Sequence, residues 1–175
     1  MELPTLSYRL IPQLAELGAT ASLTGVLPLT VLEKGALHLT LVDGIAYDLQ
    51  LTNTGNGVLL VGVAHARATT ECARCLEEAL VEVQGDVECY FMLNPRDEEL
   101  ELIDEDMVMV GADGMVDLAP PILATIVFEL PQVVLCREDC AGLCPVCGAN
   151  RTTTECACAD APSTSGPFAA LRDLL

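Results

Sequence analysis

Eight of the nine cysteines in this 175-residue chain fall into four close pairs. The pairs are Cys72/Cys75, Cys136/Cys140, Cys144/Cys147 and Cys156/Cys158. Structural zinc favours four thiolate ligands, and two cysteines separated by two residues can lie on one tight turn whose amides point at the sulfurs. Four pairs therefore predict two tetrahedral metal sites. They constrain the fold because each site has to bring two separate pairs together.

The spacing of the pairs suggests how they are matched. Cys144 and Cys147 lie in a Gly-Leu-Cys-Pro-Val-Cys-Gly knuckle typical of a zinc ribbon, and the nearest complementary pair is Cys156/Cys158. By elimination, Cys72/Cys75 and Cys136/Cys140 form the other site. Other matchings, especially Cys136/Cys140 with Cys144/Cys147, stay open because sequence alone does not fix connectivity. We expect two structural Zn²⁺ ions rather than an iron–sulfur cluster, a redox centre or disulfides.

The first residues, Met1-Glu2-Leu3-Pro4, lack the basic and apolar stretches of an export signal. No run approaches the roughly 18 apolar residues that span a bilayer, although hydrophobic residues make up 51% of the chain. We therefore expect a soluble protein in the reducing cytoplasm, without a membrane partner. There, clustered cysteines hold metal more often than they form disulfides, and an odd number of cysteines fits complete pairing poorly.

The net charge of −18, from 26 acidic and 8 basic residues, bears on the kind of partner. Nonspecific nucleic-acid binding requires a basic stripe that releases counterions, which these few cations do not supply. Basic partners, such as ribosomal proteins, are the more natural expectation. The acidic run from Asp97 to Asp106 is expected to be a solvated loop, or else a contact for such a basic partner.

Alternation of apolar and polar residues from Ala21 to Phe91 predicts a series of strands. We expect strands over 23–31, 37–41, 45–52, 58–70 and 80–91. The turns between the first four are predicted at Glu33-Lys34-Gly35, at Asp43-Gly44 and at Asn53 to Gly57. Strands with such short connections indicate an antiparallel meander or an open barrel.

Two helices are expected after the strands. Asp117 is a candidate N-cap, Pro120 and Pro121 suit a first helical turn, and Pro131 ends the helix after about Leu130. A short helix over Pro167 to Leu175 is expected to dock on the protein. The predicted fold is α+β: an antiparallel meander sheet or open barrel with one packed helix and a cysteine-rich, zinc-binding C-terminal segment. Residues 1–135 would form the core domain, including the Cys72/Cys75 knuckle, and residues 136–175 the tail packed on it.

The remaining chemically active side chains do not form a catalytic constellation. Cys89 lies alone on the apolar face of a predicted strand, where a small core residue is expected. His38 and His65 fall on polar strand faces. No GxSxG elbow, phosphate loop or HExxH helix occurs, and closed four-thiolate sites leave zinc no open position for an activated water. We therefore expect no enzymatic activity and no small-molecule substrate.

Three stretches taken together resemble one known family. They are Cys72-Ala73-Arg74-Cys75-Leu76, the run from Cys136 to Asn150 with the pattern CxxxCxGLCPxCG, and the ending Pro167-Phe168-Ala169-Ala170-Leu171. These resemble the YceD family of large ribosomal RNA subunit accumulation proteins. The resemblance implies one cysteine cluster of Cys72, Cys75, Cys136 and Cys140, and a second, optional cluster of Cys144, Cys147, Cys156 and Cys158.

The resemblance also implies a function. It suggests a non-enzymatic factor that supports large-subunit ribosomal RNA accumulation or ribosome assembly, with basic ribosomal proteins or a pre-large-subunit particle as partners. Zinc buffering or thiol redox chemistry is the alternative, because thiols are numerous. A cysteine-dependent enzyme would require one thiol that reacts much faster than the others.

Overall fold

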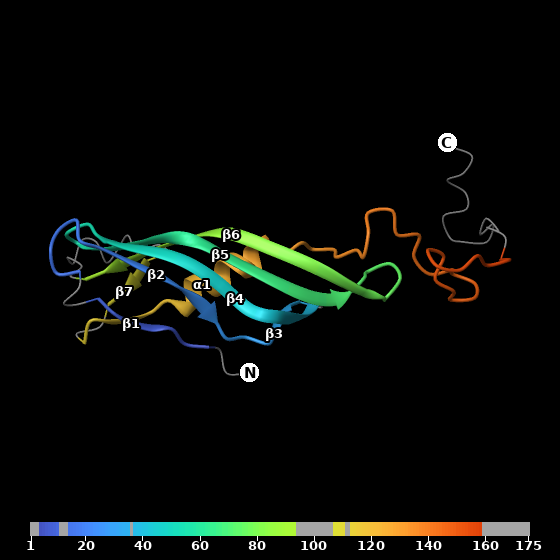
Figure 1. Ribbon diagram of the computed structural model, residues 1–175, viewed down its shortest axis with the longest axis horizontal. Coiled ribbons are helices and arrows are strands. Elements are labelled where there is room, and N and C mark those ends of the chain that lie inside the picture. Colours follow the sequence, from blue (N-terminus) through green and yellow to red (C-terminus); the bar gives the residue numbers. More distant parts are fainter. Residues whose placement is uncertain (1–3, 11–13, 36, 94–106, 111–112, 159–175) are drawn as a thin grey trace, which may run out of the picture.

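The computed structural model describes residues 4–10, 14–35, 37–93, 107–110 and 113–158 (Figure 1). Its main sheet has the order β2-β4-β5-β6-β7, and β3 also pairs with β4. These strands are β2 (Thr20–Leu27), β3 (Val31–Lys34), β4 (Leu37–Asn53), β5 (Gly57–Glu71), β6 (Glu78–Met92) and β7 (Met107–Met109). A separate pair joins β1 (Ser7–Arg9) to β8 (Met115–Asp117), and α1 spans Ala119–Glu129.

The three long strands β4, β5 and β6 form the antiparallel meander that the alternation predicted. β7 adds parallel to β6, and β2 lies at the opposite edge, so the sheet stays open. The β6 residues predicted to face the core, Val81, Val83, Val87 and Cys89, are all buried. Cys89 is 5% exposed and belongs to the core. One face of the sheet is thus apolar and covered, whereas the other is exposed and carries polar side chains together with a few apolar ones, such as Val63 and Leu80.

Two predicted strand boundaries are wrong. Asp43-Gly44 does not reverse the chain, because residues on both sides belong to β4 and the pairing with β5 shifts between Leu41 and Ile45. Gly44, with φ +77°, allows this bulge. The expected strand over 23–31 is instead two strands, since β2 ends at Leu27 and β3 begins at Val31. Aspartate-glycine suits a bulge as well as a turn, so local sequence does not distinguish them.

Helix α1 packs on the apolar face of the sheet, over β6 and β5 (Figure 1). Ile122, Leu123 and Ile126 are buried there, as their helical spacing predicted. The helix approaches β6 closely at Gly85, where a Cβ atom would lie 2.7 Å from side-chain atoms of Thr125. A larger residue at this position would require the side chains of Thr125 and Glu129, or the helix itself, to shift.

The start of α1 differs from the prediction. The N-cap residue is Leu118, without a side-chain cap, rather than Asp117. A capping side chain at position 118 would find no donor, because the second and third helical residues are Pro120 and Pro121, which lack an amide hydrogen. The Asp117 carboxylate instead accepts from the amides of Ala119 at 3.0 Å and Leu6 at 2.8 Å. It therefore ties the helix start to the N-terminal segment.

The acidic run from Asp97 to Asp106 and the expected helix over Pro167 to Leu175 lie outside the described residues. The predicted boundary at residue 135 stays a prediction. Among the residues described, no helix is both long and apolar enough to cross a membrane.

Candidate metal centre

The first cysteine cluster, which we call cage 1, joins the turn after β5 to the segment after α1. Cys72 and Cys75 come from the turn, and Cys136 and Cys140 from the segment. The Sγ atoms of Cys72 and Cys140 are 3.8 Å apart, and those of Cys75 and Cys136 are 3.6 Å apart. All four sulfurs lie within 4.8 Å of one another. Cage 1 is largely buried, with only Cys136 partly exposed.

The second cluster, cage 2, consists of Cys144, Cys147, Cys156 and Cys158, whose sulfurs also lie within 4.8 Å of one another. All four come from one segment beyond the end of the sheet (orange to red in Figure 1). Cys144 is buried, but Cys147 is exposed and the other two are partly exposed. The structure thus groups the cysteines in the matching that elimination favoured, and it does not bring Cys136/Cys140 together with Cys144/Cys147.

The knuckles of the two cages share one backbone conformation. In cage 1 the amide of Leu76 donates to the Cys72 carbonyl, and in cage 2 the amide of Gly148 donates to the Cys144 carbonyl, each at 2.9 Å. Both Leu76 and Gly148 have positive φ, of 63° and 73°. The cysteine amide that opens each knuckle is also bonded at 2.8 Å, to the carbonyl of the residue five positions later. Two segments of different sequence thus form the same turn.

Backbone amides aimed at sulfur favour the thiolate form of Cys72 in cage 1 and of Cys144 in cage 2. The Cys136 amide, with those of Arg74 and Cys75, lowers the pKa of Cys72 from 9.0 to about 6 against the opposing effect of burial. The amides of Cys147 and Val146 lower the pKa of Cys144 to about 6. These are the donors expected around a metal-bound thiolate.

Four other thiols, those of Cys75, Cys136, Cys156 and Cys158, are held in the protonated form by burial and by the thiols around them. The pKa of Cys75 is raised to about 12: the Glu77 amide lowers it, but burial and the surrounding thiols outweigh that effect. The Cys147 side chain, together with burial, raises the pKa of Cys158 to about 12. Four thiols this close cannot all ionise unless a cation neutralises them.

The geometry fits a tetrahedral thiophilic cation. Zinc–sulfur bonds of about 2.3 Å in a tetrahedron place the sulfurs about 3.8 Å apart, close to the two distances in cage 1. These separations are far from the bonding distance of about 2 Å in a disulfide, and all nine cysteines are free thiols. The residues present could therefore hold two metal ions, one in each cage, and their four-thiolate sets are those that zinc prefers.

The isolated histidines lie outside both cages. The imidazole of His38 is exposed and lies 3.2 Å from the Glu33 carboxylate, while His65 pairs across the sheet with Gln84.

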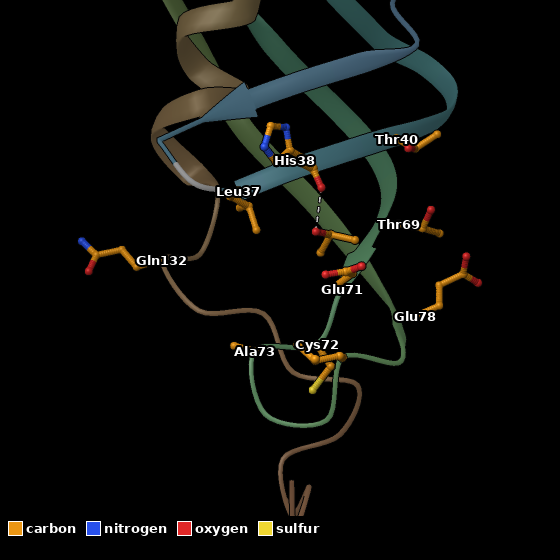
Figure 2. A pocket seen from close by; sticks show the side chains of 11 residues that line it. Leu37, His38, Thr40, Thr69, Glu71, Cys72, Ala73, Glu78 and Gln132 are labelled. Carbon is orange, nitrogen blue, oxygen red and sulfur yellow. Dashed lines mark hydrogen bonds between the residues drawn. The ribbon is translucent and has the colours of Figure 1, made fainter. Parts of the chain in front are cut away.

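A hollow of about 710 Å³ opens beside cage 1 (Figure 2). Cys72, Ala73 and Leu76 contribute to one part of its wall, and Glu71 and Glu78 to another. These two glutamates are directly opposite each other on β5 and β6. Both are exposed, so this part of the hollow is acidic. Like charges in that arrangement repel each other.

Sequence reasoning missed the residues that connect the cages. The Arg74 guanidinium donates to the Cys140 carbonyl at 3.0 Å, and the Thr152 hydroxyl accepts from the Ala141 amide at 3.1 Å. Arg74 stood inside the CxRC motif and could have been singled out. Thr152 is one of three consecutive threonines, and nothing in the sequence distinguishes it from Thr153 or Thr154.

The comparisons with known proteins agree with the cysteine pattern. Residues 60–175 match the family described as large ribosomal RNA subunit accumulation protein YceD. The chain belongs to the YceD family. The matched stretch contains both cages, β6 and α1. YceD membership confirms the resemblance carried by the CxRCL and CxxxCxGLCPxCG motifs.

Several relatives are mycobacterial. An uncharacterized protein of Mycobacterium tuberculosis and one of Mycobacterium bovis are each 36% identical over 122 residues, which cover 70% of this chain and 55% of the relative. One from Mycobacterium leprae is 33% identical over 140 residues, or 80% of this chain and 57% of the relative. The chain thus spans little more than half the length of these relatives. No solved structure matches it.

Proposed function

We propose that this protein is a non-enzymatic, zinc-carrying factor that supports accumulation of large-subunit ribosomal RNA through contacts with a basic ribosomal protein or the precursor particle. The observation that carries the proposal is the YceD match over residues 60–175, because it includes both cages. The proposal places the protein in the cytoplasm, where ribosomes assemble and thiols stay reduced.

The zinc ions have a structural role in this proposal. Each cage offers four thiolates, so a bound ion would keep no open position for water or substrate. Cage 1 would fasten the post-helix segment to the β5–β6 turn, and cage 2 would give a fixed shape to a segment with little regular structure. The ions would thereby shape the surface offered to a partner, with no chemical step at the metal.

The exposed face of the sheet carries an acidic row that supports a basic partner. Its β6 row carries four exposed carboxylates, from Glu78, Glu82, Asp86 and Glu88. The ion pairs of the described residues use other acids, Glu33 and Asp43. An acidic row of this kind repels RNA phosphates and attracts lysine and arginine side chains. Charge therefore favours a protein contact over direct contact with RNA.

Depletion in the native host tests the function. We expect mature large-subunit RNA to fall relative to small-subunit RNA, with an altered subunit profile, and re-expression of the wild-type chain to restore both. A variant with Cys72 and Cys75 replaced by serine should restore neither, provided that its abundance matches wild type. Unchanged RNA and subunit profiles on depletion would refute the proposed function.

A matched pair of variants tests the partner surface. Replacing Glu82, Asp86 and Glu88 by Gln, Asn and Gln removes three charges from the β6 row. The control variant, Glu16→Gln/Asp113→Asn/Glu129→Gln, removes three exposed charges away from this row and from both cages. We expect only the β6 variant to lose co-purification with large-subunit proteins and to fail in the depleted strain. Equal behaviour of the two variants would exclude this face as the contact.

Zinc buffering is the second candidate, favoured by the exposed Cys147 thiol in cage 2. The discriminating measurement is chelator titration followed by hydrogen exchange. A buffer would release zinc with its fold unchanged, whereas structural sites lose protection of the cysteine-bearing segment when zinc leaves.

A further inference from the structure

Cage 1 and cage 2 are connected by hydrogen bonds centred on Arg74. Its carbonyl accepts from the amide of Leu143, next to the first ligand of cage 2, at 3.1 Å. Its guanidinium donates to the carbonyl of Cys140, a ligand of cage 1, at 3.0 Å. A Cβ atom on Gly142 would lie 3.1 Å from the Arg74 carbonyl oxygen, and Gly142 has φ +72°. The knuckle of cage 1 thus sits directly against the chain leading into cage 2.

Thr152 makes the second connection, from the loop between Cys147 and Cys156. Its hydroxyl oxygen accepts from the Ala141 amide at 3.1 Å and lies 3.8 Å from the Cys140 sulfur. Because the oxygen already accepts a bond, its own hydrogen is free to point at that sulfur. The neighbouring amide of Arg151 donates to the Gly142 carbonyl at 2.9 Å. A side chain from the cage 2 loop therefore contacts a ligand of cage 1.

From this geometry we infer that the two cages bind and release metal as coupled sites, with Thr152 as the positioning residue through which closure of cage 2 secures Cys140 in cage 1. The inference rests on the zinc part of the proposed function and is independent of the ribosomal part. Thr152 does not touch a metal position; it acts through Cys140.

The physical reason is that the Thr152 loop depends on cage 2 for its shape. Residues 148–156 form turns and one isolated bridge, Leu143 with Asn150, rather than a helix or strand. Their ends are held by the cysteines of cage 2, so opening that cage releases the loop and removes the hydroxyl from Cys140. Partners that hydrogen-bond to metal ligands commonly contribute a factor of about 10–100 in metal affinity. Equilibrium coupling is reciprocal, so an open cage 1 weakens cage 2 by the same factor.

The sequence offers a closely matched set of variants. Thr152→Val keeps the shape of the side chain and removes the hydroxyl, whereas Thr152→Ser keeps the hydroxyl. Thr153→Val is the control, because the Thr153 hydroxyl is exposed and only approaches the Asn150 carbonyl, at 3.5 Å. All three are prepared as full-length, zinc-loaded protein.

The measurement is zinc release to an excess of chelator, with ions counted by native mass spectrometry and freed cysteines identified by alkylation and peptide mapping. We expect Thr152→Val to release the cage 1 ion about 10–100 times faster than wild type. Thr152→Ser and Thr153→Val should release the cage 1 ion at a rate within about twofold of wild type, a change smaller than that range. If Thr152→Val released zinc from cage 1 at the wild-type rate, the inference would be overturned.

Opening cage 2 directly provides a second arm that does not depend on the folding of Thr152→Val. Cys158→Ser should accelerate release from cage 1, and adding Thr152→Val to it should cause little further change, since both act through one contact. Two ions released independently would refute the coupling and leave the zinc and ribosomal proposals standing. Protein that never holds zinc would refute the metal proposal itself.

Discussion

At position 76 a leucine adopts the left-handed backbone conformation that Gly148 adopts in the other knuckle. A side chain there costs about 1–2 kcal/mol relative to the right-handed region. Leu76 is also 61% exposed, so it recovers little by burial. The knuckle bond from the Leu76 amide to the Cys72 carbonyl imposes this conformation. Formation of cage 1 therefore requires backbone strain at Leu76.

Replacing Leu76 by Gly should stabilise the zinc-loaded protein. The strain energy that is relieved exceeds the entropic cost of ordering a glycine on folding by roughly 0.5–1 kcal/mol. The converse change, Gly148→Leu, should destabilise by a similar amount, about 0.5–1 kcal/mol, because a Cβ at Gly148 meets no atom within 4 Å and only the backbone is strained. Urea unfolding in zinc-containing buffer measures both changes. A loss of stability in Leu76→Gly would mean that the leucine side chain packs more than its exposure indicates.

The lowered pKa values predict how the metal-free protein responds to pH. Between pH 6 and 9 the folded chain holds Cys72 and Cys144 as thiolates, while the unfolded chain keeps them protonated. The unfolded state therefore binds more protons, and stability rises with pH across this window. The contribution is lost as pH falls through about 6. Ultraviolet absorbance of thiolates should show thiols that ionise well below pH 9, with Cys72 and Cys144 titrating near 6, and a single midpoint near 9 would contradict this.

At the scale of elements, the lysine of β3 holds the end of the helix. The Lys34 ammonium donates to the carbonyls of Val127 at 2.6 Å and Leu130 at 3.1 Å. These carbonyls lie at the C-terminus of α1, where the helix dipole favours a cation. The only lysine in the chain thus fixes α1 against the β3–β4 hairpin.

Replacing Lys34 by Met keeps most of the side-chain volume and removes the two hydrogen bonds. We expect the free energy of unfolding to fall by about 1–3 kcal/mol, because the carbonyls lose a charged donor in a partly buried position. Arg67→Met is the comparison, since Arg67 makes an exposed ion pair with Asp43. Such pairs contribute about 0–1 kcal/mol. The losses are measured by denaturant unfolding. A larger loss in Arg67→Met than in Lys34→Met would contradict the capping role of Lys34.

An element could be predicted from sequence where the type of each residue reflects whether that residue is buried or exposed. The alternation in β6 and the helical spacing in α1 reflect burial of each residue, and both predictions hold. The bulge at Gly44 and the role of Asp117 could not be predicted, because each depends on a partner far along the chain, β5 in one case and Leu6 in the other. The contact of Thr152 with Cys140 is missed for the same reason, since it arises only once both cages are assembled.

At the scale of the whole molecule the two cages close loops of very different length. Cage 1 links Cys75 to Cys136 across sixty intervening residues, including β6 and α1, whereas cage 2 joins Cys147 to Cys156 across eight. The chain-entropy relation for cross-links gives roughly 4 kcal/mol for the longer loop and roughly 2.5 kcal/mol for the shorter. Cage 1 should therefore stabilise the fold as a whole, and cage 2 mainly its own segment.

Cys136→Ser and Cys158→Ser test this difference with equivalent changes. Each removes one partly exposed thiolate from one cage. If the coupling through Thr152 is reciprocal, it affects both variants alike and cancels in the comparison. Cys136→Ser should then lower the free energy of unfolding by about 1–2 kcal/mol more than Cys158→Ser in zinc-saturated buffer. Hydrogen exchange should show faster opening near Val134, whose carbonyl accepts from the Ala73 amide, only in Cys136→Ser. An equal or larger loss in Cys158→Ser would mean that cage 1 is not what fastens the post-helix segment to the sheet.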